Sequence, residues 1–239
     1  MKDYFVFDGV DCRDFGVHAF VKNAFSAPTR SYTDTIIPAR NGSVLIDGRR
    51  YDNAETSYTC VIYEDLGRNL PNFREFLLSR VGYKRLEDSI NPDEFYQACY
   101  MSAFEPVVDT ERKRCKVQVI FKRKPQRFLR SGEIPITIGS VSASKIHNPC
   151  RFSSQPLIRV YGTGQIQIDD QMITVSSNYS EEYIDIDCDV MVASYDGQSE
   201  NQYVSFSGND FPVLHEGINN IELSGGVTQV VITPRWFRM

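Results

Sequence analysis

The most chemically suggestive side chains are three carboxylates at alternate positions, Asp185, Asp187 and Asp189, in the stretch YIDIDCDV. Carboxylates grouped in this way can act as acid and base or bind calcium, and Glu181 and Glu182 lie just upstream. On a strand, however, residues two apart share one face, and the residues between them share the other. The alternation therefore favours a strand with one exposed face over a catalytic or calcium site. The apolar residues that we expect on its buried face are Ile184, Ile186, Cys188 and Val190.

Other residue types used by enzymes and metalloproteins are sparse or scattered. The three histidines, His18, His147 and His215, occur in unrelated contexts, and no two cysteines lie within four residues of each other. Zinc sites need closer spacing, so the cysteines are typical of buried, reduced thiols. The phosphate-binding glycine motifs and the G-x-S-x-G nucleophile elbow are missing from the sequence. We therefore predict no catalytic residues, no metal site and no cofactor.

A short stretch from Ile36 to Asn53 has a different character, because it combines turn signals with arginines. Its turn signals are Asn41-Gly42 and Asp47-Gly48. Little of this stretch can reach the protein's own core, so we predict a hairpin arm that contacts a neighbouring copy of the chain. Its arginines would suit bidentate contacts with carboxylates of that neighbour. The alternative is an ordinary solvent-exposed hairpin. The candidate interface residues are Arg40, Asn41, Gly42, Val44, Leu45, Ile46, Arg49 and Arg50.

Charge divides the chain into two halves. Residues 1–130 carry 21 Lys and Arg against 18 Asp and Glu, whereas residues 131–239 carry 5 against 13. This asymmetry suggests two domains, 1–132 and 133–239, that meet in the turn-rich segment RSGEIP. The net charge of −5 argues against specific nucleic-acid binding. No apolar stretch suits a membrane span or a signal peptide, which indicates synthesis in a cytoplasm.

The first half predicts short strands and one helix. Alternation places Tyr58, Cys60 and Ile62 on one face of a strand, and it points Val117, Val119 and Phe121 inward on another. The segment NLPNFREFLLSRVG predicts a helix capped by Asn69, with Pro71 in its first turn and Gly82 at its end. A basic run at the end of the later strand is expected to be solvated. The expected apolar stripe of the helix is Leu70, Phe73, Phe76, Leu77 and Val81, and the basic run is Lys122, Arg123, Lys124, Arg127 and Arg130.

The second half predicts an all-β domain. Seven strand candidates are separated by Gly, Asn, Asp and Pro at the spacing of a β-sandwich. The glycines of VYGTGQ are interpreted as a hairpin turn between two of these strands. The candidates are ITIGS, PLIRVYG, GQIQIDDQMITVS, YIDIDCDVMVAS, QYVSFSG, GINNIELSGG and TQVVITPRWFR.

Several segments, in collinear order over the whole chain, resemble the distal tail protein (Dit) family of long-tailed bacteriophages. The segment FKRKPQRFLRSGE is similar to the family's F-x-C-K-P-Q-x-F-L-x-S-G-E, and the chain's end is similar to strands that finish in Pro-Arg-Trp-Trp. Three positions depart from the family pattern: Ala39 replaces a glycine, Arg123 a cysteine and Phe237 a tryptophan. The other segments that carry the resemblance are FDGVDCRDFGV, IPARNGSVLIDGRRYDN and YKRLEDSINPDEFYQACY.

The resemblance implies a mainly β fold with two β-sandwich domains. The N-terminal belt domain would carry one helix and the projecting hairpin arm, and the C-terminal domain would be galectin-like. Six copies would close into a homo-hexameric ring at the distal end of the tail in the virion. This ring would be a structural hub between the tail tube protein, a tail-associated hub or spike protein, and receptor-binding or baseplate proteins, without enzymatic activity. Residues 131–239 leave no room for an inserted carbohydrate-binding module.

A lectin is the main alternative, with the galectin-like half binding host-surface sugars. Sugar sites commonly place an aromatic ring among polar side chains. The aromatic candidates are Trp236, Tyr195 and Tyr203, but no His-Asn-Arg set lies near the two tyrosines in the sequence. A wall-degrading hydrolase is a third possibility, and the lack of an evident acid–base pair argues against it.

Overall fold

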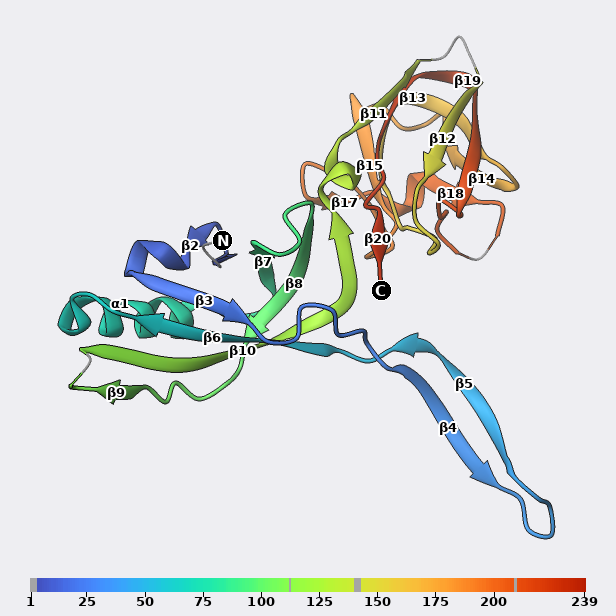
Figure 1. Cartoon of the computed structure of the whole chain (residues 1–239). Coiled ribbons are helices and arrows are strands. Elements are labelled where there is room, and N and C mark those ends of the chain that lie inside the picture. Colours follow the sequence, from blue (N-terminus) through green and yellow to red (C-terminus); the bar gives the residue numbers. More distant parts are fainter. Residues whose placement is uncertain (1–3, 112, 140–142, 209) are drawn as a thin grey trace. The chain divides into compact units, whose positions relative to one another are not determined.

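The chain folds as two compact units (Figure 1). The computed structural model describes residues 4–111, 113–139, 143–208 and 210–239. The N-terminal unit runs to Arg127 and includes Met239, and the C-terminal unit spans Phe128–Arg238. The predicted mainly β fold with one α-helix is confirmed for the described residues. The domain limits 1–132 and 133–239 stay predictions.

One antiparallel sheet forms the body of the N-terminal unit. Its strands are β1 (Phe5–Phe7), β2 (Val10–Asp11), β3 (Val17–Val21), β6 (Ala54–Ile62), β7 (Lys84–Asp88), β8 (Glu94–Tyr100), β9 (Val107–Asp109) and β10 (Arg114–Leu129), the last of which continues into the C-terminal unit. The strand order is β2-β1-β7-β8-β10-β6-β3, with β9 paired to β10. Two further strands, β4 (Arg30–Ile36) and β5 (Ser43–Tyr51), form a separate two-stranded sheet.

Alternation along β6 and β10 directs one row of each strand into the core. The Phe121 ring lies 4.8 Å from the Phe7 ring and 5.4 Å from the Phe5 ring, measured between centroids. Such tilted and edge-on aromatic pairs contribute beyond their buried area. The side chains predicted to point inward are all buried: Tyr58, Cys60 and Ile62 on β6, and Val117, Val119 and Phe121 on β10.

Helix α1 (Leu66–Ser79) covers this core but begins earlier than the sequence predicted. The prediction that Asn69 caps the helix is wrong: Asp65 is the cap residue, and the Asn69 side chain donates to the Glu64 carbonyl (2.9 Å). Pro71 therefore lies inside the helix, where it removes one backbone hydrogen bond. Of the expected stripe, Phe73, Phe76 and Leu77 are buried and Leu70 is partly buried, whereas Val81 lies beyond the helix and is exposed.

The C-terminal unit holds the remaining strands. They are β11 (Ile136–Gly139), β12 (Ser144–Asn148), β13 (Leu157–Ile168), β14 (Gln171–Val175), β15 (Tyr183–Asp187), β16 (Val192–Tyr195), β17 (Gln198–Ser199), β18 (Val204–Phe206), β19 (Gly217–Thr233) and β20 (Phe237–Arg238). The main path is β11-β19-β13-β15-β16-β17, and β12 also pairs with β19. On another branch, β14 pairs with β13 and then with β18.

Two long strands, β13 and β19, each take part in two groups of strands. The first half of β13 pairs with β15 and its second half with β14, while β19 pairs first with β12 and later with β11. Their mutual register shifts between Tyr161 and Gly162. The interpretation of VYGTGQ as a hairpin turn is therefore wrong, because this segment is the bend of one continuous strand. GINNIELSGG and TQVVITPRWFR likewise share the single strand β19.

Glycine makes this bend possible. Gly162 has φ +87°, and a Cβ atom there would lie 2.2 Å from the Gly226 carbonyl oxygen. Gly164 has φ +143°, and its Cβ would lie 2.4 Å from the Ser224 carbonyl oxygen. Side chains cannot fit between two backbones that approach so closely, and L-residues rarely adopt these φ values. The two strands can thus bend together while they stay paired, as at the corners of orthogonal β-sandwiches.

The cysteines and the sole tryptophan contribute to the two cores. Five cysteines are buried and Cys99 is partly buried, and all six are free thiols. Burial raises the pKa of Cys12 and of Cys188 to about 12, which makes both thiols inert at neutral pH. Trp236 lies in the core of the C-terminal unit. Among the described residues, no helix combines the length and apolar character that crossing a bilayer requires.

Phe121→Ala is expected to destabilise the N-terminal unit by about 3–5 kcal/mol, because it removes a ring from an aromatic core that cannot collapse fully into the cavity. Urea unfolding followed by circular dichroism measures the loss, while Trp236 fluorescence follows the C-terminal unit separately. Phe25→Ala is the matched control: this ring is 83% exposed, and its removal should shift stability by less than about 0.5 kcal/mol. Equal effects of the two variants would contradict this account of the core.

Candidate functional sites: a projecting hairpin and a polar cleft

The β4–β5 hairpin lies outside the core of the N-terminal unit (Figure 1). Residues 37–42 form its tip, where the Arg40 amide donates to the Ile37 carbonyl (3.2 Å). The positive φ of Ala39 and of Gly42, +63° and +80°, turns the chain there. The predicted Asn41-Gly42 turn signal therefore lies in the tip. The hairpin is longer than the stretch Ile36 to Asn53 suggested, because β4 begins at Arg30.

The second turn signal, Asp47-Gly48, is not a turn. Asp47 pairs with Tyr32 and Tyr51 pairs with Arg30, so three residues of β5 stand opposite the single residue between those partners on β4. This is a β-bulge, and Gly48 lies where a Cβ atom would come within 2.9 Å of a backbone oxygen of β4. Gly48 thus allows two strands to approach closely. The Asp-Gly dipeptide alone does not show whether its glycine serves a turn or such a bulge.

An ion pair that the sequence did not single out joins the two strands beside the bulge. The Arg30 guanidinium contacts Asp47 through Nε (3.0 Å) and Nη2, and it lies over the Tyr51 ring. Hydrogen bonds from Arg30 and from the Arg49 amide lower the pKa of the Asp47 carboxyl to about 2. Both side chains are exposed, so the pair aligns the strands rather than providing much stability.

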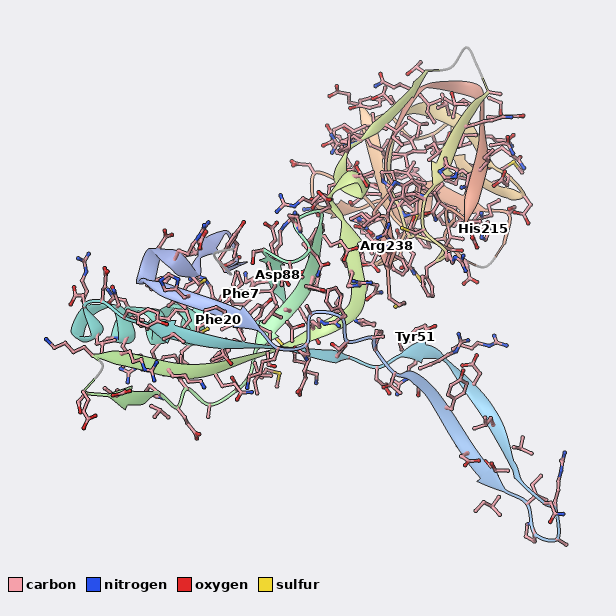
Figure 2. The ribbon with its side chains drawn as sticks, in the orientation of Figure 1. Phe7, Phe20, Tyr51, Asp88, His215 and Arg238 are labelled. Carbon is pink, nitrogen blue, oxygen red and sulfur yellow. The ribbon has the colours of Figure 1, made fainter. Side chains whose placement is uncertain are left out.

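The hairpin exposes apolar side chains on both faces (Figure 2). Register places Tyr32, Ile36 and Leu45 on one face, and Ile46 with Val44 on the other. Ile36 is 81% exposed, Leu45 64% and Ile46 56%. A two-stranded hairpin without a covering sheet or helix is marginal in water, and its exposed apolar side chains make it a candidate interaction site.

All eight predicted interface residues lie in the hairpin, but its arginines are not brought together. Arg40 lies in the tip, whereas Arg49 and Arg50 lie near the end of β5. Arg50 is 3.8 Å from Asp52 in an exposed ion pair. That Arg40, Asn41, Gly42, Val44, Leu45, Ile46, Arg49 and Arg50 form a subunit interface stays a prediction.

A buried arginine holds the root of the hairpin. Arg123 is 1% exposed, which corrects the expectation that the whole basic run is solvated. Its Nε donates to the Thr56 hydroxyl (3.0 Å) after the hairpin, and its Nη2 donates to the Ser26 carbonyl (2.7 Å) before it. Its guanidinium also lies 4.7 Å from the centre of the Tyr96 ring. Arg123 therefore ties the chain entering the hairpin to the chain leaving it.

Further hydrogen bonds support the same root. The Asn23 side chain accepts from the Ser57 amide (2.9 Å) and donates to the Glu55 carbonyl (2.8 Å). The Asn53 side chain donates to the Tyr83 hydroxyl (2.8 Å). Burial lowers the pKa of Arg123, yet no carboxylate is paired with it among the described residues. The root is therefore held by neutral acceptors and an aromatic ring.

The carboxylates of β15 pair with arginines. Arg159 binds Asp185 through two contacts of 2.7 and 2.8 Å, and Arg235 binds Asp187 at the same two distances. Ile184, Ile186 and Cys188 are buried as predicted. The expectation for Val190 is wrong: β15 ends at Asp187, and Val190 is exposed in the turn that follows. The described residues contain no cluster of three or more His, Cys, Asp or Glu side chains suited to a metal.

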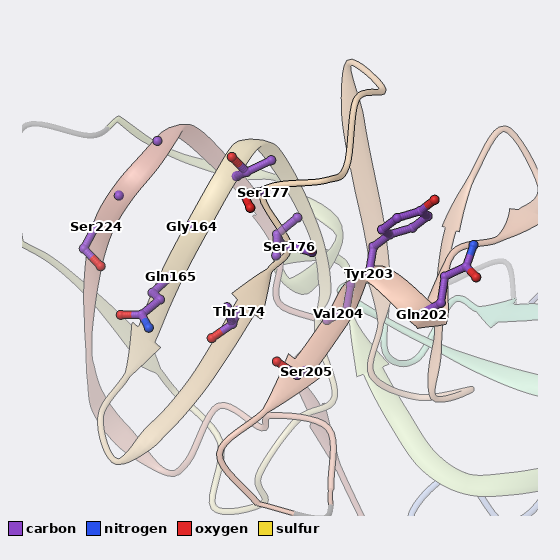
Figure 3. A pocket seen from close by; sticks show the side chains of 14 residues that line it. Gly164, Gln165, Thr174, Ser176, Ser177, Gln202, Tyr203, Val204, Ser205 and Ser224 are labelled. Atoms are coloured by element: carbon purple, nitrogen blue, oxygen red, sulfur yellow. The ribbon is translucent and has the colours of Figure 1, made fainter.

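The C-terminal unit also holds an open cleft of about 680 Å³ (Figure 3). Its lining comes from β13, β14, β18 and β19 and from the segments around Ser177 and Gln202. None of the lining residues carries a charge, and most bear a hydroxyl or an amide or are glycine. Tyr203 contributes its ring, which packs 5.4 Å from the Tyr179 ring. Tyr203 was one of the aromatic candidates in the sequence; the rest of the lining was not anticipated.

Comparison with solved structures finds whole-length similarity. The chain matches the crystal structure of the SPP1 Dit protein, described as a paradigm of the hub adsorption apparatus in phages that infect Gram-positive bacteria, with TM-score 0.75, 15% identity and 99% of each chain covered. It also matches the phage P2 baseplate in its activated conformation with Ca (TM-score 0.56, 10% identity, 97% of each chain). The corresponding structure with Sr matches with TM-score 0.54 and 12% identity, covering 99% of this chain and 98% of that one.

No protein-family model and no curated protein sequence matches the chain. The expected likeness to distal tail proteins is thus confirmed at the level of the fold, which extends over both units.

The Asp47 carboxyl is expected to titrate near pH 2 in the folded protein, against 3.8 without its partners. Because the folded pKa is the lower one, the pair's contribution to the hairpin is complete above pH 3.8 and is lost as the pH falls through about 2. NMR titration of the Asp47 side chain measures this midpoint. In Arg30→Met the midpoint should move back towards 3.8, and an unchanged midpoint would show that Arg30 is not its cause.

Arg123→Met should loosen the root of the hairpin without unfolding the protein. The variant removes the donors that hold Ser26 and Thr56, but it also removes a buried charge, so global stability should fall little or even rise. Amide hydrogen exchange should become faster in residues 22–29 and 52–57 and stay unchanged in α1. Arg40→Met, at the exposed tip, is the control and should leave exchange at the root unaltered. If the amides at the root exchange equally slowly in both variants, Arg123 does not hold the root.

Proposed function

We propose that this protein is the distal tail hub of a long-tailed bacteriophage and forms a homo-hexameric ring in the virion. The observation that carries the proposal is its likeness to the SPP1 Dit protein over 99% of both chains, which includes both units. The proposed partners are the tail tube protein, a tail-associated hub or spike protein, and receptor-binding or baseplate proteins. The protein would act by assembly and not by catalysis, and it would be made in the cytoplasm of the bacterial host.

The hairpin supplies one half of the proposed subunit interface. A closed ring needs two different patches on each subunit, because every contact joins one patch to the other kind on the neighbour. The exposed side chains Ile36, Leu45 and Ile46 would form the first patch. For the second we propose a surface of the N-terminal unit that exposes Met101 and Val107.

Arginines would orient the hairpin on its neighbour. Arg40 and Arg49 form no ion pair within the described part of the chain, and both are exposed. Each could therefore bind a carboxylate of the adjacent subunit with two parallel hydrogen bonds. Apolar contact would provide most of the affinity, and these charged contacts would fix the register. On this proposal the belt domain, residues 1–132, closes the ring, and residues 133–239 remain available to other tail proteins.

The alternative function, a carbohydrate-binding adhesin module, draws support from the neutral cleft in the C-terminal unit. It predicts a protein that binds sugars without forming a ring, whereas the hub predicts a ring whether or not sugars bind. Oligomeric state separates the two functions. A wall-degrading hydrolase has no support in the described residues, where the carboxylates Asp185 and Asp187 are both held by arginines.

Light scattering or electron microscopy of the purified protein, or of tails, is expected to reveal a ring with about six times the 27.3 kDa chain mass. Leu45→Asp should prevent ring closure, because a charge would replace an apolar contact buried at the interface. Leu78→Asp is the matched control, since Leu78 on α1 is similarly exposed, at 59%, but lies outside the hairpin. Both variants should remain folded by circular dichroism.

Deletion of residues 41–49 is a second, more drastic variant with the same expected result. Rings from Leu45→Asp or from the deletion would refute the role of the hairpin while leaving the hub in place. Tails that assemble normally without the protein would refute the hub itself. A stable monomer that is absent from virions and binds sugars would favour the adhesin.

A further inference from the structure

One row of side chains crosses the floor of the cleft at a single register. Gln165 on β13 pairs with Ser224 on β19 and with Thr174 on β14, and Thr174 pairs with Ser205 on β18. Directly paired residues of an antiparallel sheet share a face, so these four side chains stand on one side of four adjacent strands. Figure 3 shows them side by side, and at about 4.8 Å per strand the row is roughly 14 Å long.

The groups of this row are free to bind a ligand. None of the four side chains has a hydrogen-bond partner within the described part of the chain. Hydroxyls and amides can each donate and accept, so the row offers both roles along its length. The lining contains no charged residue, although charged residues make up 24% of the chain. A phosphate or an acidic polymer would find no cation among the described residues that line this cleft.

The bend of the long strands gives the cleft its depth. Beside Gln165 and Ser224, Gly164, Gly225 and Gly226 line the wall where β13 and β19 approach each other. No side chain rises from the sheet at these three positions. At the other end of the row, Tyr203 directly precedes β18, the strand that carries Ser205, and offers an aromatic surface there (Figure 3). The cleft thus combines an open path, neutral hydrogen-bonding groups and one ring at its side.

We propose that this cleft binds a neutral oligosaccharide, laid along the row from Ser224 to Ser205. Sugar hydroxyls donate and accept as the row does, and the C–H faces of a sugar ring pack against an aromatic side chain such as Tyr203. A peptide strand would instead pair with the free backbone edge of β18 and would have little use for the row. The site lies wholly within the C-terminal unit, so it does not rest on ring formation.

Saturation-transfer NMR and calorimetry on the full-length protein test the site. The probes are neutral hexose oligosaccharides (maltohexaose, mannohexaose and galactohexaose) and, for comparison, a hexamer of galacturonate. At least one neutral probe should bind saturably, and the charged hexamer should not. Gln165→Glu should weaken binding about tenfold, because it removes amide donors and places a charge in the cleft. Gln165 is exposed, so this substitution should leave the fold intact.

Gln198→Glu is the matched control: Gln198 is an exposed strand residue of the same unit and lies outside the cleft lining. This variant should bind the neutral probe as the unchanged protein does. The proposal is overturned if no neutral probe binds, if the galacturonate hexamer binds equally well, or if both Glu variants weaken binding alike. If no neutral probe binds and Gln165→Glu also blocks attachment of another tail protein, the cleft serves a protein partner instead.

Discussion

A hairpin of two strands cannot bury its own side chains, and this constraint governs the N-terminal unit. The β4–β5 hairpin presents apolar residues on both faces, and only another surface could bury them. If the hairpin also moved freely about its root, binding to another surface would cost much conformational entropy. The contacts of Arg123 with Ser26 and Thr56 would reduce that loss, since they hold both segments of the chain at the root of the hairpin. The buried Arg123 would therefore prepare the exposed hairpin for binding by restricting the motion of its root.

A different constraint shapes the C-terminal unit, where β13 and β19 must each serve two groups of strands. Their bend needs backbones close together, which glycine at Gly162 and Gly164 permits. The same absence of side chains that allows the bend leaves a hollow on the outer face. Beneath it, the alternate residues Ile166 and Ile168 of β13 are fully buried in the core. Gly164 thus takes part both in the bend and in the lining of the cleft.

Alternation and helical periodicity predicted which side chains are buried, as on β10 and β15, because burial depends on local pattern. Two of the failures arose where one short glycine-containing signal fits two geometries. Asp47-Gly48 suits a turn or a bulge, and the glycines of VYGTGQ suit a turn or a bent strand. The local sequence could not distinguish these geometries, because the pairing with the partner strand determines which one forms. Pro71 indicated a first helical turn, but it lies inside α1. Packing of Phe73 and Phe76 in the core stabilises the helix despite this proline.

For a similar reason, the sequence predicted one of the candidate sites and missed the others. The hairpin was found because its turn signals and arginines are contiguous in sequence. The root and the cleft were not, since Arg123 meets Ser26 and Thr56 from 97 and 67 residues away. The row from Ser224 to Ser205 likewise comes from four strands, and none of its residues is unusual alone. Such neutral, dispersed surfaces leave no local signature.

The hairpin and the cleft have different surface chemistry, and their proposed roles complement each other. The hairpin offers apolar side chains and arginines, which favour a protein surface with carboxylates. The cleft offers neutral hydroxyls and amides, which would give weak, reversible contacts with the proposed oligosaccharide. Weak contacts gain strength when several copies are held in one assembly, because each later contact forms at a high effective concentration. The proposed six-membered ring would therefore combine several weak sites into one strong attachment.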